Sequence, residues 1–175
     1  SVVGGPGQIP AGVATGVRLP LKAPIGAAVV AHRDDRARAG WLASAEDSHR
    51  SAFEDVLEQV RKNGVAVFGL GDADPKVLDV LGEVAELLAR HPQRGALRVR
   101  VFELLVGLGG TPYSAAQLAD PGPLSISYLV APIFDAEGRA MYELQLGPLR
   151  PEVSAAEREH YVQELKATAA QLSRH

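Results

Sequence analysis

The apolar and polar residues toward the end of the chain alternate in a way that predicts a β-hairpin. An apolar run ends at Phe134, turn residues follow at 135–138, and an alternating strand runs from 140 to 146. The period of two separates the side chains of this last strand into two sets, Tyr142, Leu144 and Leu146 on one face and Met141, Glu143 and Gln145 on the other. Either face could line a ligand pocket.

A helical period predicts an amphipathic helix over 51–62, followed by a short buried strand over 65–68. Asn63 and Gly64 form a good stop between the two, because both residues tolerate the left-handed conformation. The apolar positions of this helix recur on one face, at Phe53, Val56, Leu57 and Val60.

The closing helix has the clearest start signal in the chain. Ser154 and Glu157 have the spacing of a capping box, in which each side chain satisfies a free main-chain N–H. The apolar spacing predicts that its inward residues are Tyr161, Leu165, Thr168 and Leu172.

Four further helices are expected. Asp34 is a suitable N-cap for a short helix that carries Trp41, and Asp74 caps an apolar helix over 74–90. A third covers 96–108 and a short one lies near 114–118. These elements predict an α/β (α+β) class, with one domain over 1–175. Its central, mostly antiparallel sheet would have helices on one face and, on the other, a ligand pocket under loops and helices.

Composition favours binding over catalysis. The chain has 175 residues, a formal net charge of −3 and no cysteine, so thiolate metal sites, disulfides and strong phosphate binding are not expected. The five histidines lack the compact spacing of metal ligands, and there is no G-x-S-x-G motif of a serine nucleophile. The glycine-containing segments 69–71 and 107–110 are too short to form a dinucleotide-binding motif. No metal, cofactor or membrane span is expected. No signal peptide is visible, so the expected location is cytoplasmic.

Three segments, in order, resemble the effector-binding domain of IclR-type bacterial transcriptional regulators. Residues 18–31 are similar to the family's "LPL-x5-GxxxLA" segment, and residues 56–67 to its "L-x-x-[IV]-R-x-x-G-[YV]-A" segment. Residues 130–139 with 146–148 are similar to its "AAPVFDxxG…SGP" hairpin. The closing helix also occupies the family's position.

The resemblance implies a GAF-like fold and control of transcription by a small effector. It also implies self-association as a dimer or tetramer, and DNA binding only through a helix-turn-helix domain that precedes this chain. The long stretch between Val67 and the hairpin departs from the family and indicates a helical insertion over about 74–118.

The resemblance also indicates which residues line the expected ligand pocket. Leu144 and Leu146 align with the family's effector-binding Ser-x-Ser pair, Phe68 lies near its acidic position, and Tyr128 replaces a polar residue. These changes favour a hydrophobic or aromatic effector over a small carboxylate. The predicted ligand-binding residues are Gly26, Ala27, Phe68, Tyr128, Leu144 and Leu146. Gly26 and Ala27 would offer main-chain N–H groups.

Three other functions remain open at this point. The domain could be a GAF-type sensor of another signalling protein, or a structural dimerisation domain. It could also be a small α+β enzyme, a lyase or isomerase, that uses Glu143 and Tyr142 as acid and base. A buried Glu143 with a raised pKa would favour the enzyme, and a fully exposed one would argue against it.

Overall fold

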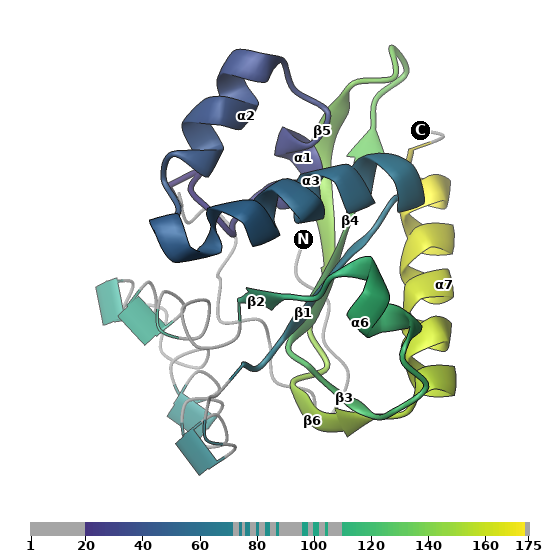
Figure 1. Ribbon diagram of the computed structural model, residues 1–175. Helices are drawn as coiled ribbons and strands as arrows, with labels where there is room; N and C mark the ends of the chain where they lie inside the picture. The colour runs from purple at the N-terminus through teal and green to yellow at the C-terminus, as the bar shows by residue number, and fades with distance from the viewer. Residues whose placement is uncertain are drawn as a thin grey trace.

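The computed structural model describes residues 20–71 and 110–173, together with isolated positions between them. These ranges contain helices together with antiparallel strands, which confirms the α+β class (Figure 1). Residues 1–19 and more than half of the positions in the helices expected over 74–90 and 96–108 lie outside the described residues, and so does more than half of the expected insertion. Within the described part, no helix is long and apolar enough to cross a bilayer.

The first described elements are three helices and one 3-10 turn, namely α1 (Ala27–Val30), α2 (Asp35–Leu42), η1 (Asp47–His49) and α3 (Arg50–Asn63). Asp34 caps α2 as expected, since its side chain accepts a hydrogen bond from the Ala37 N–H at 2.8 Å. The predicted stop of α3 is also confirmed, with Gly64 in the left-handed region at φ 74°.

The main sheet is antiparallel and has the strand order β2-β1-β4-β5. Its strands are β1 (Ala66–Gly69), β2 (Thr111–Pro112), β4 (Tyr128–Phe134) and β5 (Ala140–Leu146). Strands β4 and β5 form the predicted hairpin. Its turn is closed by a hydrogen bond from the Asp135 N–H to the Arg139 carbonyl at 3.0 Å, and Gly138 has a φ of 76°.

Four elements complete the described chain: α6 (Ala115–Ala119), β3 (Leu124–Ile126), β6 (Arg150–Val153) and α7 (Ala155–Leu172). The capping boxes that begin α6 and α7 are formed, at Ser114 and Ser154. Strands β3 and β6 pair in a second, two-stranded sheet that the apolar pattern did not predict.

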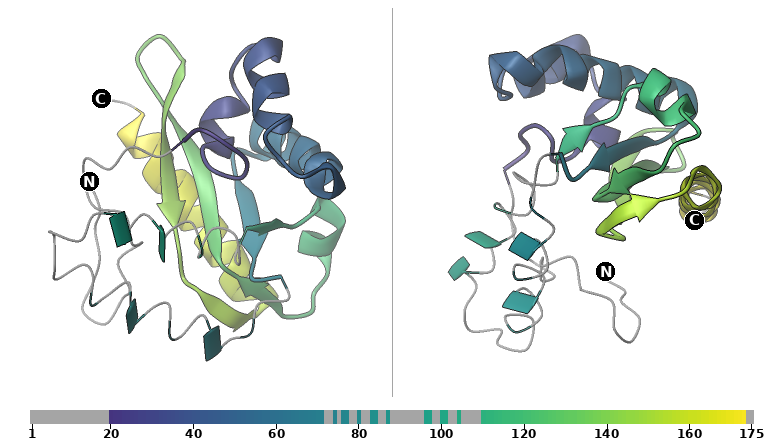
Figure 2. Two further views of the ribbon diagram at one scale, coloured as in Figure 1. Left: turned by 90° about the vertical axis from the view of Figure 1, so that its left-hand side faces the viewer. Right: turned by 60° about the horizontal axis from the view of Figure 1, so that its bottom comes forward.

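Helices cover both faces of the main sheet (Figures 1 and 2). One apolar cluster lies between α1–α3 and the sheet, and it includes Phe68, Tyr128 and Val130. The other lies between α7 and the sheet, and it includes Val67, Leu129 and Ala131. Adjacent residues of β1 and β4 therefore enter opposite clusters, as strand alternation requires.

The inward face of α7 is the predicted one at Tyr161 and Leu165, and it differs by one position after them. Leu165 is buried as expected, but Thr168 is exposed and Leu172 is 48% exposed. The buried partners of Leu165 are instead Ala169 and Arg158. The prediction was wrong at the two later positions because Thr168 and Ala169 are both weakly apolar, so the periodicity did not separate them.

Arg158 is an unusual part of this face, because its side chain is charged and only 5% exposed. Its guanidinium donates hydrogen bonds to three main-chain carbonyls, those of Leu118 at 3.1 Å, Asp120 at 2.6 Å and Gly122 at 3.3 Å. The carbonyls that follow the end of α6 are thereby satisfied, and the segment 118–122 is attached to α7.

Arg158→Met should therefore destabilise the domain. The substitution keeps the apolar stem but leaves partly buried carbonyls without their donor, which costs about 1–3 kcal/mol of unfolding free energy. Chemical denaturation measures this loss. Arg150→Met removes an exposed arginine that pairs with Glu157, so it should change stability by less than about 1 kcal/mol. Equal effects of the two substitutions would contradict the assigned role.

Candidate functional site

Two aromatic residues form the apolar part of the candidate site. Phe68 on β1 is fully buried and Tyr128 on β4 is 8% exposed, and their rings stack with centroids 4.4 Å apart and planes at 16°. The register of β1 and β4 pairs these two residues directly. They share the α1–α3 cluster with Ala27 and Ala28, so the structure brings four of the six predicted residues, with Gly26 beside Ala27, to one face.

The chain segment before α1 is held against this face by α2. The Trp41 indole N–H donates to the Ile25 carbonyl at 2.8 Å, and the Ala23 N–H donates to the Ser44 hydroxyl at 3.0 Å. Gly26 then enters α1 with a φ of 78°, a conformation that strongly favours glycine. Sequence reasoning missed Trp41 and Ser44 as positioning residues, since nothing near them in the chain points to residues 23–25.

Glu143 on β5 supplies the polar part of the site. Its Oε2 accepts a hydrogen bond from the Ala28 N–H at 2.8 Å, and the carboxylate also interacts with the main-chain N–H of Gly26. The N–H groups at the start of α1 were expected to contact a ligand, through Gly26 and Ala27. In the structure a side chain of the protein itself takes this position, and the second N–H is that of Ala28. Gly26, Ala28, Phe68, Tyr128 and Glu143 are called the Glu143 site below.

Burial changes the acidity of both titratable groups of the Glu143 site. Loss of water around the half-buried carboxyl raises the pKa of Glu143 to about 7, although the N–H groups of Ala28 and Gly26 act in the opposite direction. Burial raises the pKa of the Tyr128 hydroxyl as well, and the negative charge of Glu143 adds to that effect. Tyr128 is therefore a neutral phenol at physiological pH.

Neither group has a side-chain partner among the described residues. The ion pairs in that part of the chain involve other carboxylates, and no basic side chain there contributes to the pKa of Glu143. The Tyr128 hydroxyl donates no hydrogen bond to any described group, whereas Tyr113 donates to the Ser125 carbonyl at 2.9 Å. Buried polar groups are usually paired, so these two side chains stand out within the part of the chain that the structure describes.

Leu144 and Leu146 do not lie at the Glu143 site. Both are partly buried in the cluster that α7 covers, on the opposite face of the sheet from Tyr128. Strand alternation is the reason, because Glu143 faces α1 and its neighbours must face the other way. Tyr142 shares that other face and is 68% exposed, so the predicted Glu143–Tyr142 acid–base pair is not assembled.

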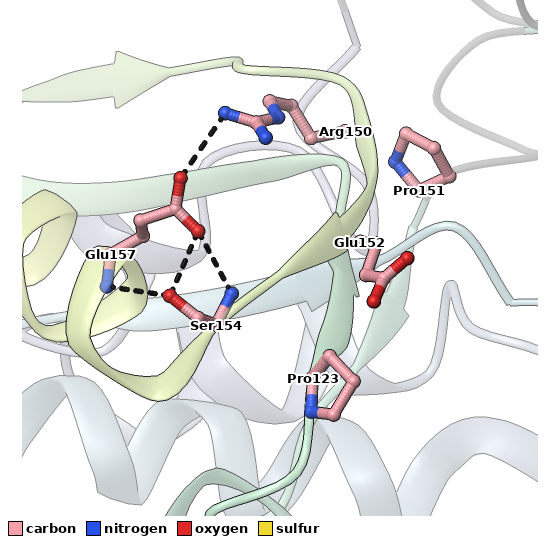
Figure 3. Close-up of a pocket in the computed structure, with 6 residues that line it drawn as sticks. All are labelled: Pro123, Arg150, Pro151, Glu152, Ser154 and Glu157. Atoms are coloured by element: carbon pink, nitrogen blue, oxygen red, sulfur yellow. Dashed lines mark hydrogen bonds and ion pairs between the residues drawn. The ribbon is translucent and has the colours of Figure 1, made fainter.

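A separate hollow of about 410 Å³ lies where β6 meets α7 (Figure 3), lined by Pro123, Arg150, Pro151, Glu152, Ser154 and Glu157. Its polar groups largely satisfy one another. Glu157 accepts from the Ser154 N–H at 3.0 Å and from its hydroxyl at 2.8 Å, and it pairs with Arg150 at 3.4 Å. These contacts cap α7, so a structural role explains them. Among the described residues, no group of three or more acidic or histidine side chains could hold a metal ion.

The raised pKa of Glu143 predicts a pH-dependent stability. Between about pH 4.5 and 7 the unfolded carboxyl is ionised while the folded one retains its proton. The folded state then binds more protons, so the unfolding free energy falls as the pH rises through this window. Denaturation at about pH 5 and pH 8 should show this loss in the wild type and a smaller one in Glu143→Gln. The exposed Glu54→Gln is the control and should keep the wild-type dependence. An unchanged pH dependence in Glu143→Gln would contradict the assignment.

Comparisons of the chain with protein-family models, with curated proteins and with solved structures find no significant match. A functional assignment therefore depends on the residues of the chain and their geometry, above all on Glu143 and Tyr128.

Proposed function

We propose that the domain is a small-molecule sensor, the effector-binding domain of a bacterial transcriptional regulator similar to the IclR type. A ligand would bind at the Glu143 site, against the α1–α3 face of the sheet. The ordered motifs around residues 18–31, 56–67 and 130–148 support the regulator type. An α+β fold with an antiparallel sheet is compatible with the GAF-like architecture that this resemblance implies.

The observation that carries the proposal is a pair of polar side chains in apolar surroundings, neither of which has a side-chain partner among the described residues. Ligand sites are mostly apolar, with a few polar groups that fix the orientation of the ligand. The Phe68–Tyr128 stack belongs to the buried α1–α3 cluster and supplies the apolar surroundings, while the Tyr128 hydroxyl and the Glu143 carboxyl supply the polar groups. A sensor needs no further chemistry than this.

A signal could leave the site through α1. Glu143 holds Ala28 by a hydrogen bond, and α2 holds the preceding segment through Trp41. A ligand that binds Glu143 changes the strength of the first contact and so favours one arrangement of α1 relative to β5. Under the proposal, two such arrangements would differ in how a dimer or tetramer holds the DNA-reading domains that the resemblance implies.

Tyr128→Phe tests the proposed site. A thermal-shift screen of aromatic and apolar compounds should identify ligands that raise the melting temperature of the wild-type chain. Removing the hydroxyl should then weaken binding about fivefold or more, which corresponds to one lost hydrogen bond of about 1 kcal/mol. The fold should persist, since no described group accepts a hydrogen bond from that hydroxyl.

Tyr142→Phe is the matched control, because Tyr142 is exposed on the opposite face of β5. It should leave the affinity within about twofold, since an exposed hydroxyl away from the site makes no contact with the ligand. If no compound raises the melting temperature, or if the two tyrosine substitutions weaken binding equally, the proposal fails.

A second candidate function is proton transfer by Glu143, and its pKa of about 7 is the observation that favours it. In this function Tyr128, which lies on the same face of the sheet as Glu143, would take the acid–base role that the sequence analysis gave to Tyr142. The two functions are distinguished by whether the bound compound is recovered unchanged or is converted to a product. Recovery of a bound compound unchanged, as judged by mass spectrometry after prolonged incubation, supports the sensor. Conversion that Glu143→Gln abolishes supports the enzyme.

A further inference from the structure

The Glu143 side chain joins two parts of the chain that are far apart in the sequence. Its Oε2 accepts a hydrogen bond from the Ala28 N–H at 2.8 Å, and the carboxyl also interacts with the Gly26 N–H. Glu143 lies on β5, whereas both N–H groups lie at the start of α1. The first N–H groups of a helix have no partner within the helix, so a side chain of the sheet here fulfils that role and holds α1 against β5.

The surroundings of this contact favour a neutral carboxyl. Gly26, Ala27 and Ala28 are buried, and the two alanines belong to the apolar α1–α3 cluster. A carboxylate loses much more hydration free energy in such surroundings than a protonated carboxyl does. Separation of α1 from β5 would return Glu143 to water, where a glutamate ionises at a lower pH. The raised pKa of Glu143, about 7 with α1 in place, has the direction that this geometry requires.

The segment before α1 has an attachment of its own. The Trp41 indole N–H holds the Ile25 carbonyl at 2.8 Å, and the Ile25 N–H donates to the Lys22 carbonyl at 2.7 Å. Gly26 follows with a φ of 78°, in a region of conformation that is open to glycine at little cost. Rotation at Gly26 can therefore redirect α1 while Ile25 stays attached to α2. The Glu143–Ala28 contact lies beyond this hinge and is the one that such a rotation would break.

The other ionisable groups around α1 and Glu143 do not produce the same pH dependence. On β4, Tyr128 has a raised pKa and stays protonated at neutral pH. His32 follows α1, and burial lowers its pKa, with the charge of Arg61 on α3 adding to the effect. Protonation of His32 therefore destabilises the closed form as the pH falls, which is the opposite direction.

The remaining charged groups on these elements differ in type or position. His49 on η1 faces Phe53 and Glu46. Helix α7 packs on the opposite face of the sheet. The charged residues nearest to α1 and Glu143 along the chain are of types that titrate outside pH 5–8, namely Lys22, Arg33, Asp34, Asp135 and Arg139.

We infer that Glu143 and Gly26 form a proton-dependent latch on α1. The protonated carboxyl holds α1 against β5, and loss of its proton to solvent favours release of α1 by rotation at Gly26. The inference goes beyond the proposed function, because the latch operates without a ligand. It makes the position of α1 sensitive to pH between about 5 and 7.

Amide hydrogen exchange, followed by NMR on the full chain from pH 5 to pH 8, tests the latch. The Ala28 N–H donates to Glu143, and the Val30 N–H donates across the hinge to the Gly26 carbonyl. Their exchange rates, divided by the intrinsic rate at each pH, give the opening equilibrium of α1. Opening releases one proton, so this equilibrium should rise about tenfold per pH unit between about pH 5 and 7 and level off above pH 7. The Leu165 N–H of α7 should exchange more slowly throughout.

Three substitutions assign the effect to Glu143. Glu143→Gln keeps an oxygen that can accept the Ala28 N–H but cannot ionise, so its opening equilibrium should change less than about twofold from pH 5 to pH 8. Glu54→Gln removes an exposed charge on α3 and should keep the wild-type rise. His32→Gln should also keep it, because titration of His32 acts in the opposite direction.

A corrected Ala28 exchange rate that stays constant or falls from pH 5 to pH 7 would overturn the inference. An equal rise in Glu143→Gln would overturn it as well, and so would equal protection of Ala28 and Leu165, which indicates unfolding of the whole domain in place of release of α1. If Glu143→Gln does not fold, the pH series of the wild type and of His32→Gln decides the question. No ligand takes part in these measurements, so their outcome is independent of the compound screen that tests the sensor function.

Discussion

The burial of β4 on both of its faces is the constraint on which the rest of the domain depends. Tyr128 and Val130 contact the helices α1–α3, while Leu129 and Ala131 contact the α7 side. If β4 slipped by one residue against its neighbouring strands, these two sets of side chains would exchange faces. The packing of α1–α3 on one face and of α7 on the other is therefore compatible with only one register of β4. The hairpin turn transmits that register to β5, and Glu143 consequently reaches the start of α1.

Local signals in the sequence predicted most of the described elements. The capping box at Ser154, the stop at Gly64 and the hairpin turn each lie within a few residues of the structure that they determine. Strands β3 and β6 were missed because they are short and pair only with each other, with little apolar content in β6. Nothing in the alternation of β5 indicated which of its faces meets α7, since that choice depends on how distant helices pack.

The sequence predicted part of the candidate site, and the part that it missed depends on contacts between residues far apart in the chain. Phe68 and Tyr128 follow from the strand pattern and the resemblance, and they meet in the structure. Leu144 and Leu146 were chosen because they align with the family's effector-binding pair, but apolar residues on a strand more often face the core, and here they do. The contact of Glu143 with Ala28 spans 115 positions of the chain. It depends on the placement of α1 by Trp41, which no short motif encodes.

Arg158 has a mechanical consequence for any movement within the domain. Its three hydrogen bonds join the first half of α7 to the carbonyls of residues 118–122, which lead directly into β3. Strand β3 pairs in turn with β6, and β6 leads back into α7. These segments close a ring of covalent and hydrogen-bonded links. The N-terminal half of α7 is therefore linked to the small sheet at both ends of this ring, whereas α1 lies outside the ring and is held by its own contacts in the α1–α3 cluster.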